Sequence, residues 1–423
     1  MIDTVDRGLL KLSNTLVMCV TDYMLTLPKY KTITKTRRTL VKKAVNCFIH
    51  NTFTTYCSGR KRSQITLDQN HFGTGGIVNG VKLKPRVSYT YTKLVLSALE
   101  DSGYVVLVVG GRTYEWDLKT RQIVSVDTCS YLEYQTKLQI LYNNYKPEYK
   151  VKLLRNIYEL RDEEKKPKVY KTTSEIKLEK ENVYDYNNLT LTQDVSDNKD
   201  RVYNCQIKKI FNIDFKTGGK SFMTDNGIQH LSKKERMDLM INNNETVIYD
   251  YKAFEPSIAY SINQELMKDD PYMVEWDLYD KDTLRTLGKM ALTTMLYASN
   301  KREAVGALNY EISQDLDVDQ LYDEGLIPKP CIPVKELIEE LEEKNKVIKN
   351  LLYNNVEHNL SNIGSKIMDF IINYFTQRSI LVLPVFDEVI IEMDHEDKLK
   401  EVMEMAYQSV LGFTDNCTIV KEK

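Results

Sequence analysis

The sequence predicts an α+β protein in which a small antiparallel sheet is combined with long amphipathic helices. Residues 247–249 are β-branched or aromatic with no breaker among them, so they predict a strand, which ends at Asp250. Pro256 then favours the start of a helix that extends to about Leu266. Far along the chain, residues 380–392 form two apolar runs around a short acidic turn, which indicates a hairpin. We expect these strands to share one sheet.

Composition and charge limit the classes of function. The hydrophobic fraction of 42% and the charged fraction of 28% are ordinary for a globular protein, and 423 residues suffice for two or three domains. Because the formal net charge is −2, any attraction to nucleic acid must come from local basic patches. No apolar run approaches the roughly 20 residues that span a bilayer, and the first residues lack a signal-peptide pattern. We therefore expect no membrane partner.

Cysteine usage indicates the compartment. Seven cysteines are scattered along the chain, and none forms a Cys-x-x-Cys pair. The sequence thus indicates neither a zinc site nor a disulfide framework. We expect a reducing, intracellular and cytoplasmic location.

A polar, charge-dense segment over residues 161–190 is the predicted domain boundary. We expect this segment to be an exposed linker or a surface insertion. It separates residues 1–160, which are expected to handle nucleic acid, from residues 191–423, which carry the acidic strands.

The N-terminal region is predicted to be mainly helical, with a basic second helix. Residues 5–27 place apolar side chains broadly on one stripe, and a second amphipathic helix extends to about Tyr56. Basic residues alternate here with aromatic ones, a pattern that fits a surface following a phosphate backbone. An ordinary solvated helix face is the alternative interpretation. The candidate nucleic-acid-binding residues are Lys35, Arg37, Arg38, Lys42, Arg60, Lys61 and Arg62.

A winged-helix-like hairpin is predicted later in the same region. Residues 88–100 favour a helix, residues 103–109 favour a strand, and Gly110 and Gly111 favour a turn into a further strand. Modules of this outline often bind duplexes, but the same outline also occurs as plain structure.

The C-terminal region is predicted to surround its acidic strands with helices. A capping box formed by Ser232 and Glu235 favours a helix that continues through Met240. The final residues, near 417–420, favour a strand. Further helices are expected over residues 191–212, 282–297, 303–310, 334–352, 361–375 and 397–411.

Asp250 and Asp387 are candidate ligands of divalent cations. Carboxylates at strand ends are hard oxygen donors that suit Mg²⁺. Aliphatic strands on both sides of Asp387 and Glu388 make these acids costly to bury without a cation, although a solvated turn is the alternative interpretation. The sequence therefore predicts that the two strands hold two cations between them.

One face of the helix over residues 282–297 is suited to phosphate binding. Arg285 and Lys289 are one helical turn apart and point the same way, with Thr293 on the same face. Both cations can reach one triphosphate. An ordinary solvated helix face is the alternative interpretation of the two cations. Tyr297, near the end of the same helix, could be either a ligand-binding residue or an ordinary core residue.

These motifs together resemble family A DNA polymerases. Asp250 followed by Glu255 resembles the family's first palm motif. The order of Arg285, three residues, Lys289, seven residues and Tyr297 is similar to its fingers helix. Phe386, Asp387 and Glu388 resemble its third motif, which lies on a hairpin. The resemblance covers roughly residues 191–423, and the stretch before the first motif is similar to phage-type members.

The resemblance implies a right-hand polymerase fold with a small antiparallel palm sheet and helical fingers in residues 191–423. Residues 1–160 would then be a thumb-like or nucleic-acid-handling region without recognisable exonuclease acids. The implied activity is template-directed addition of dNTPs to a primer 3′ end. Two Mg²⁺ ions, which Mn²⁺ could replace, are the implied cofactors. Primer-template nucleic acid and replication accessory proteins are the implied partners of a monomer located in the host cytoplasm.

The family also implies roles for individual residues. Asp250, Asp387 and the Tyr251 carbonyl would bind the metal ions, and Glu388 would be a secondary catalytic carboxylate. Lys289 would donate a proton to the leaving pyrophosphate. The nucleotide-binding set is Arg285, Lys289, Thr293, Tyr297, Glu255 and Tyr251.

Three departures from the family pattern are visible, and two other functions stay open. Ala298 replaces a usual Gly, Phe386 replaces a usual His, and Thr293 replaces a usual aromatic residue. Glu255 favours deoxynucleotides, because its family counterpart blocks a ribose 2′-hydroxyl. An RNA polymerase or primase-like activity on the same fold is one alternative. A non-catalytic DNA-binding replication factor is the other.

Overall fold

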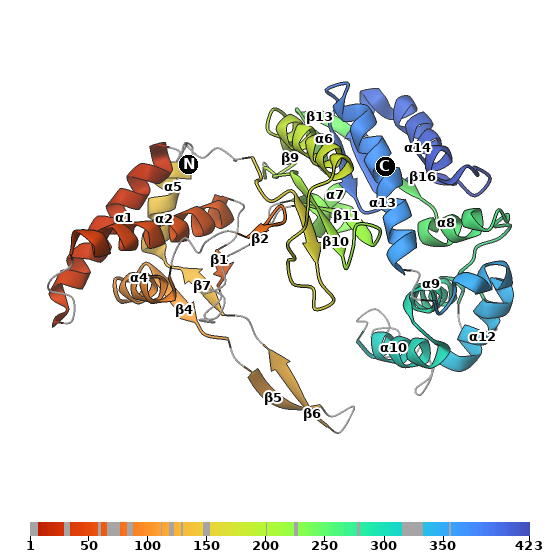
Figure 1. The fold of residues 1–423 in the computed structure, drawn as a ribbon, viewed down its shortest axis with the longest axis horizontal. Coiled ribbons are helices and arrows are strands. Elements are labelled where there is room, and N and C mark those ends of the chain that lie inside the picture. Colours follow the sequence, from red (N-terminus) through yellow and green to blue (C-terminus); the bar gives the residue numbers. More distant parts are fainter. Residues whose placement is uncertain are drawn as a thin grey trace. The chain divides into compact units, whose positions relative to one another are not determined.

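The computed structural model divides the chain into two units (Figure 1). The N-terminal unit comprises residues 1–155, 199–204 and 225–227, and the C-terminal unit comprises residues 156–198, 205–224 and 228–423. The structure describes residues 7–28, 34–57, 61–65, 77–82, 88–110, 112–117, 122–127, 130–146, 153–199, 201–223, 227–276, 280–314, 333–354 and 357–423.

Among the described residues of the N-terminal unit, four helices pack around a three-stranded sheet. The helices are α1 (Arg7–Thr26), α2 (Lys35–Cys57), α4 (Tyr89–Asp101) and α5 (Thr136–Tyr145). The antiparallel sheet has the order β1 (Arg62–Gln64), β7 (Tyr131–Tyr134) and β4 (Val105–Val108). Its core is formed by buried side chains such as Leu16, Ile49, Phe53, Leu99 and Tyr142. The apolar stripes of α1 and α2 explain this packing.

The predicted winged-helix hairpin is wrong in its pairing. Strand β4 pairs with β7, and not with the strand that follows the two glycines. That strand, β5 (Arg112–Asp117), pairs instead with β6 (Gln122–Asp127). Burial explains the choice, because Val105 of β4 and Leu132 of β7 both enter the core. A further short hairpin joins β2 (Ile77–Val78) to β3 (Val81–Lys82).

The C-terminal unit is built on a six-stranded sheet. Its order is β14 (Val382–Val385), β15 (Glu388–Glu392), β13 (Asn244–Tyr251), β12 (Leu239–Ile241) and β9 (Val195–Asp197), and β16 (Ile419–Lys421) pairs with the end of β13. The pairs are antiparallel. Strand β13 is central, and its buried Val247 and Ile248 account for the apolar run in the sequence. The α+β class predicted from the sequence is confirmed.

A second sheet of the same unit has the order β11 (Gly218–Met223), β10 (Ile207–Asn212) and β8 (Tyr158–Arg161). Strand β10 is antiparallel to β11 and parallel to β8.

Helices cover both sheets of the C-terminal unit. They are α6 (Ser174–Thr190), α7 (Lys233–Arg236), α8 (Phe254–Ile262), α9 (Lys281–Tyr297), α10 (Lys301–Gln314), α12 (Val334–Lys344), α13 (Glu357–Thr376) and α14 (Glu396–Leu411). Short 3₁₀ turns lie at η3 (Ile228–His230), η4 (Lys346–Leu351) and η5 (Met393–His395). Helix α13 is central to the packing of this unit, because it contacts α6, α8, α14 and β11 (Figure 1).

Three segments differ in secondary structure from the prediction, because contacts with distant parts of the chain determine their conformation. Residues 161–190, expected as a linker or insertion, contain α6, whose Tyr186 is fully buried and donates a hydrogen bond to the Val382 carbonyl. Residues 191–212, expected as a helix, form β9 and β10 instead. The predicted helix through Met240 is also shorter, because α7 ends at Arg236 and β12 follows.

Within the described part of the chain, no helix combines the length and the apolar character that crossing a bilayer requires.

Candidate active site

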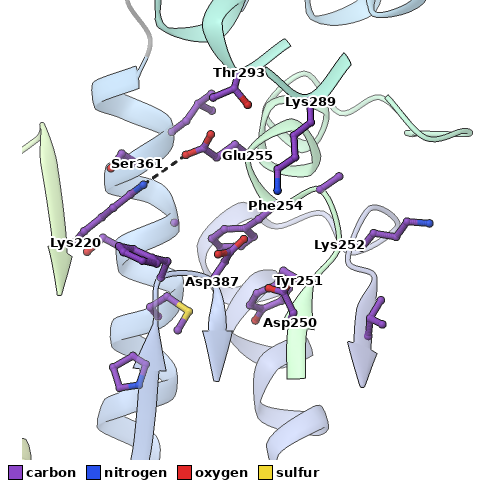
Figure 2. Close-up of a pocket in the computed structure, with 18 of the residues that line it drawn as sticks. Lys220, Asp250, Tyr251, Lys252, Phe254, Glu255, Lys289, Thr293, Ser361 and Asp387 are labelled. Carbon is purple, nitrogen blue, oxygen red and sulfur yellow. Dashed lines mark ion pairs between the residues drawn. The ribbon is translucent and has the colours of Figure 1, made fainter. Parts of the chain in front are cut away.

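A cavity of about 560 Å³ lies within the C-terminal unit (Figure 2). Its walls come from β11, the end of β13, the start of α8, one face of α9, α13, the β14–β15 turn and the end of β16. Of the site residues predicted from the sequence, the lining includes Asp250, Tyr251, Glu255, Arg285, Lys289, Thr293 and Asp387. Residues separated widely in the sequence therefore meet in one concave site.

The sheet places the two aspartates. Asp250 is near the end of β13, directly opposite Glu388 of β15. Asp387 lies in the two-residue turn between β14 and β15, beside Phe386, whose φ is +60°. A bulky residue rarely adopts this left-handed conformation, so the turn is locally strained. Figure 2 shows Asp250 and Asp387 among the side chains that line the cavity.

Burial changes the protonation of both aspartates. Burial, together with the carboxylates of Asp387, Glu388 and Glu422, raises the pKa of Asp250 to about 7, and the Lys289 ammonium acts against this shift. Burial likewise raises the pKa of Asp387, with the same ammonium acting against the shift. The charge of Lys289 therefore affects the pKa of both carboxylates.

The aspartates fit a divalent cation. Asp250 Oδ1 is buried and accepts no hydrogen bond from any described residue, which leaves an acceptor that a cation would satisfy. The described residues contain no cluster of three or more His, Cys, Asp or Glu side chains that could hold a metal ion. Mg²⁺ commonly takes only one or two carboxylates and completes its shell with water and substrate phosphates, so two aspartates suffice chemically.

Helix α9 carries two cations in the cavity wall, one paired with a carboxylate and one unpaired among the described residues. Its N-terminus is capped by Asp280, which accepts hydrogen bonds from the backbone N–H groups of residues 282 and 283. The Arg285 Nε donates to Asp270 Oδ2 at 2.7 Å, and its guanidinium lies 5.3 Å from the centre of the Tyr272 ring. Lys289 is exposed and forms no ion pair with a described residue. Lys289 is thus the cation of this face that is free to meet an anionic ligand.

The segment before α9 is packed tightly against the helix. A Cβ added at Gly288 would overlap the carbonyl oxygen of Tyr272, so only glycine allows this close approach. The same contact brings Tyr272 beside Arg285.

Glu255 is held by two partners. Tyr297 donates a hydrogen bond to Glu255 Oε1. Lys220 Nζ of β11 lies 3.6 Å from the same oxygen, as the dashed line in Figure 2 marks. Tyr297 is therefore neither a core residue nor part of the cavity lining, while Thr293 lies in the lining. Sequence reasoning missed Lys220, although Gly218 and Gly219 directly before it are a visible signal of a turn into a strand.

Tyr251 turns its side chain into the core. Its ring stacks on Phe254 with 4.7 Å between ring centres, and its hydroxyl donates to the Met403 carbonyl at 2.7 Å. Only the backbone of Tyr251 is therefore available for the predicted metal contact.

Glu388 is engaged differently from the prediction. It lies outside the cavity lining and accepts two hydrogen bonds from Arg236 of α7. Sequence reasoning missed Arg236, because nothing local marks an arginine near the end of a capped helix as a partner of a residue so far along the chain.

The predicted nucleic-acid-binding residues belong to the N-terminal unit. Lys35, Arg37, Arg38 and Lys42 are exposed on α2. Lys61 is also exposed, and Arg62 pairs with Glu133 at 3.1 Å. Arg60 lies outside the described residues.

No family model and no curated protein match this sequence. Among solved structures, the chain is similar to the POL domain of Pol1 from M. smegmatis in complex with DNA primer-template and dNTP. The TM-score is 0.31 and the identity 11%, over 99% of this chain and 66% of that one. A similarity of this size does not define a shared fold.

Proposed function

We propose that the C-terminal unit is a template-directed DNA polymerase that adds dNTPs to a primer 3′ end. The observation that supports this most is the shared cavity of Asp250 and Asp387, two partly buried carboxylates whose pKa values the unpaired Lys289 affects. Carboxylates that collect a cation beside a free ammonium suit a substrate that carries phosphates.

Asp250, Asp387 and the Tyr251 carbonyl would hold two Mg²⁺ ions, or Mn²⁺ in their place. Bound there, the ions would lower the pKa of the primer hydroxyl and neutralise phosphate charge. The orphaned Asp250 Oδ1 supports this assignment.

Lys289 and Arg285 would act on the triphosphate. The primer 3′-oxygen forms a bond to the α-phosphorus, and the bond from that phosphorus to the pyrophosphate oxygen breaks. The hydroxyl proton leaves to solvent, and the Lys289 ammonium donates a proton to the leaving pyrophosphate. Arg285 would first exchange its contact with Asp270 for a phosphate oxygen.

Glu255 would select deoxynucleotides. Its carboxylate is fixed from two sides by Tyr297 and Lys220, so it cannot move aside for a ribose 2′-hydroxyl. An RNA polymerase or primase-like activity remains the alternative that nucleotide competition tests.

The exposed face of α2 would bind the phosphate backbone of the nucleic acid. The helix contains no Asp or Glu, and its cations at 35, 37, 38, 42 and 43 are exposed. None of them forms an ion pair with a described residue. Cations near a helix N-terminus also oppose the helix dipole, so a bound polyanion would relieve an unfavourable arrangement.

The motif resemblance supports a finer proposal. The protein would be a compact, exonuclease-lacking, phage-type family A member that acts as a monomer in the host cytoplasm. Replication accessory proteins would be its partners.

Primer extension with labelled oligonucleotides, dNTPs and Mg²⁺ tests the proposal. The wild type should extend the primer, and Asp250→Ala should reduce the rate by about a thousandfold or more. No extension by the wild type, or full extension by Asp250→Ala, would reject the polymerase assignment. Nucleic-acid binding with steep salt dependence but no turnover would favour the non-catalytic replication factor.

A further inference from the structure

Glu388 and Arg236 form a buried, two-pronged ion pair. Arg236 Nε donates to Glu388 Oε1 at 2.8 Å, and Arg236 Nη2 donates to Oε2 at 3.0 Å. The relative exposures of the side chains are 14% and 9%. This bidentate geometry is the strongest form of carboxylate recognition, and it occupies both oxygens of Glu388.

The arginine is itself held in place. Its third nitrogen, Nη1, donates to the Leu231 carbonyl at 2.6 Å. Helix α7, which ends at Arg236, is fixed at its start by the reciprocal capping box of Ser232 and Glu235. These contacts therefore fix the position of the guanidinium beside Glu388.

The pair lies beside the aspartate that lacks a partner. Asp250 and Glu388 are directly opposite on neighbouring antiparallel strands, where like charges destabilise the sheet. Of the two, Asp250 lines the cavity with an unpartnered oxygen, and Glu388 lies outside the lining with both oxygens engaged. Of these neighbouring carboxylates, only Asp250 thus has a buried oxygen left for a cation, because Arg236 engages both oxygens of Glu388.

We propose that Arg236 is a positioning residue that holds Glu388 away from the cation site. The inference rests on the proposed function and deepens it, because it leaves Asp250 and Asp387 as the carboxylates that bind the cations. Without Arg236, the Glu388 carboxylate would compete for a cation at Asp250 and draw it away from the position that the reaction needs.

Binding of Mn²⁺ to the nucleotide-free full-length protein, followed by electron paramagnetic resonance, provides a measurement that does not depend on turnover. Arg236→Met removes a nearby positive charge and frees Glu388, so it should bind Mn²⁺ about tenfold more tightly while extending primers more slowly. A merely structural role would weaken both. Arg236→Lys, which keeps the charge, should bind Mn²⁺ within about threefold of the wild type.

The double variant Arg236→Met with Glu388→Met separates a positioning role from direct ligation. It replaces the ion pair by apolar side chains of similar volume, a change that buried pairs often tolerate. If Glu388 is not a ligand, the double variant should bind Mn²⁺ within about threefold of the wild type and extend faster than Arg236→Met. Mn²⁺ binding weaker by about thirtyfold or more in the double variant would make Glu388 a ligand and overturn the proposal.

Thermal unfolding of each variant identifies those that fold, and the lysine and double variants test the proposal if Arg236→Met does not. The polymerase assignment is judged separately, by extension with the wild type. If the wild type does not extend primers but the Mn²⁺ pattern holds, the polymerase assignment fails and the role of Arg236 stands. If extension succeeds but Arg236→Met weakens Mn²⁺ binding, the role of Arg236 fails alone.

Discussion

The exposed face of α2 and the cavity of the C-terminal unit are both rich in charge, but they use it differently. On α2, cations at 35, 37, 38, 42 and 43 have no acidic residue in their own helix and no ion pair with a described residue. In the cavity, three of the lining cations are paired: Lys220 with Glu255, Lys233 with Glu422, and Arg285 with Asp270. Unpaired cations suit a surface that binds phosphates without regard to nucleic-acid sequence. Paired cations instead hold particular side chains in a fixed position.

Lys289 and Lys252 are the exceptions, because each lines the cavity and forms no ion pair with a described residue. Of the two, Lys289 is the informative one, because its ammonium acts on the pKa of both aspartates. The comparison therefore predicts that Lys289 interacts with substrate directly, while its paired neighbours position other groups. The following experiments test that division.

The largest effect is expected for Lys289→Met. Loss of the ammonium that would bind phosphate and donate the proton should lower kcat by about a hundredfold to a thousandfold. Single-turnover extension measures this rate. Lys281→Met, which removes an exposed cation at the start of the same helix and outside the cavity lining, is the control and should be close to wild type. Equal loss in both variants would contradict a specific role.

Neutralising α2 should weaken nucleic-acid binding without changing the chemistry. Replacing Arg37, Arg38, Lys42 and Lys43 by Gln should lower affinity for duplex DNA by about a hundredfold and reduce the salt slope by about 3 to 4. Fluorescence anisotropy over a range of salt concentrations measures both.

Lys346→Gln with Lys398→Gln is the matched control for α2. These exposed lysines pair with Glu343 and Glu401, so their loss should leave binding nearly unchanged. If the control reduces the salt slope as much per charge as the α2 variant does, the unpaired face has no special role.

Glu255→Ala should relax sugar selection. Removing the fixed carboxylate should raise the ratio of rNTP to dNTP incorporation by about tenfold to a hundredfold. Tyr297→Phe, which removes the hydroxyl that donates to Glu255, should have a smaller effect in the same direction. Competition between rNTP and dNTP on one template measures the ratio, and no change for either variant would refute the proposed role of Glu255 in sugar selection.

The smallest effect is a change in the pH dependence of stability. Because the pKa of Asp250 is raised from 3.8 to about 7, the native state retains a proton that the unfolded chain releases. Metal-free wild type should therefore lose stability as the pH rises from about 4 to 7, on the order of 1 kcal/mol after allowance for solvent screening. Asp250→Asn should lose less stability over this range, because only the contribution of Asp387, whose pKa is also raised, remains.

Scanning calorimetry in the presence of a chelator compares the two proteins at pH 5 and pH 8. Added Mg²⁺ should stabilise the wild type much more than Asp250→Asn, because the variant lacks one of the two proposed carboxylate ligands. Identical pH profiles would show that the burial of Asp250 carries no free-energy penalty.

Local patterns in the sequence predicted much of the C-terminal unit. The apolar run before Asp250, the acidic hairpin and the long helix that became α9 were all found, because each depends on its own periodicity and turn residues. Asp250 and Asp387 were placed in one site by the argument that their strands pair.

What the sequence did not predict depends on distant partners. Tyr186 makes α6 part of the core through a hydrogen bond to a residue 196 positions away. Arg236 meets Glu388 across 152 positions, and no motif marks either residue for the other. Interactions of this kind follow from the assembled fold, so they are invisible in a window of neighbouring residues.

Phe386 combines an unfavourable backbone conformation with a place in the cavity wall. This side chain is 50% exposed and occupies a backbone conformation, φ +60°, that glycine adopts without penalty. Phe386→Gly would therefore relax the turn and stabilise the hairpin by up to about 1 kcal/mol, yet it would remove a ring from the edge of the cavity. A variant that becomes more heat-resistant while becoming a poorer catalyst is the outcome that such a trade-off implies.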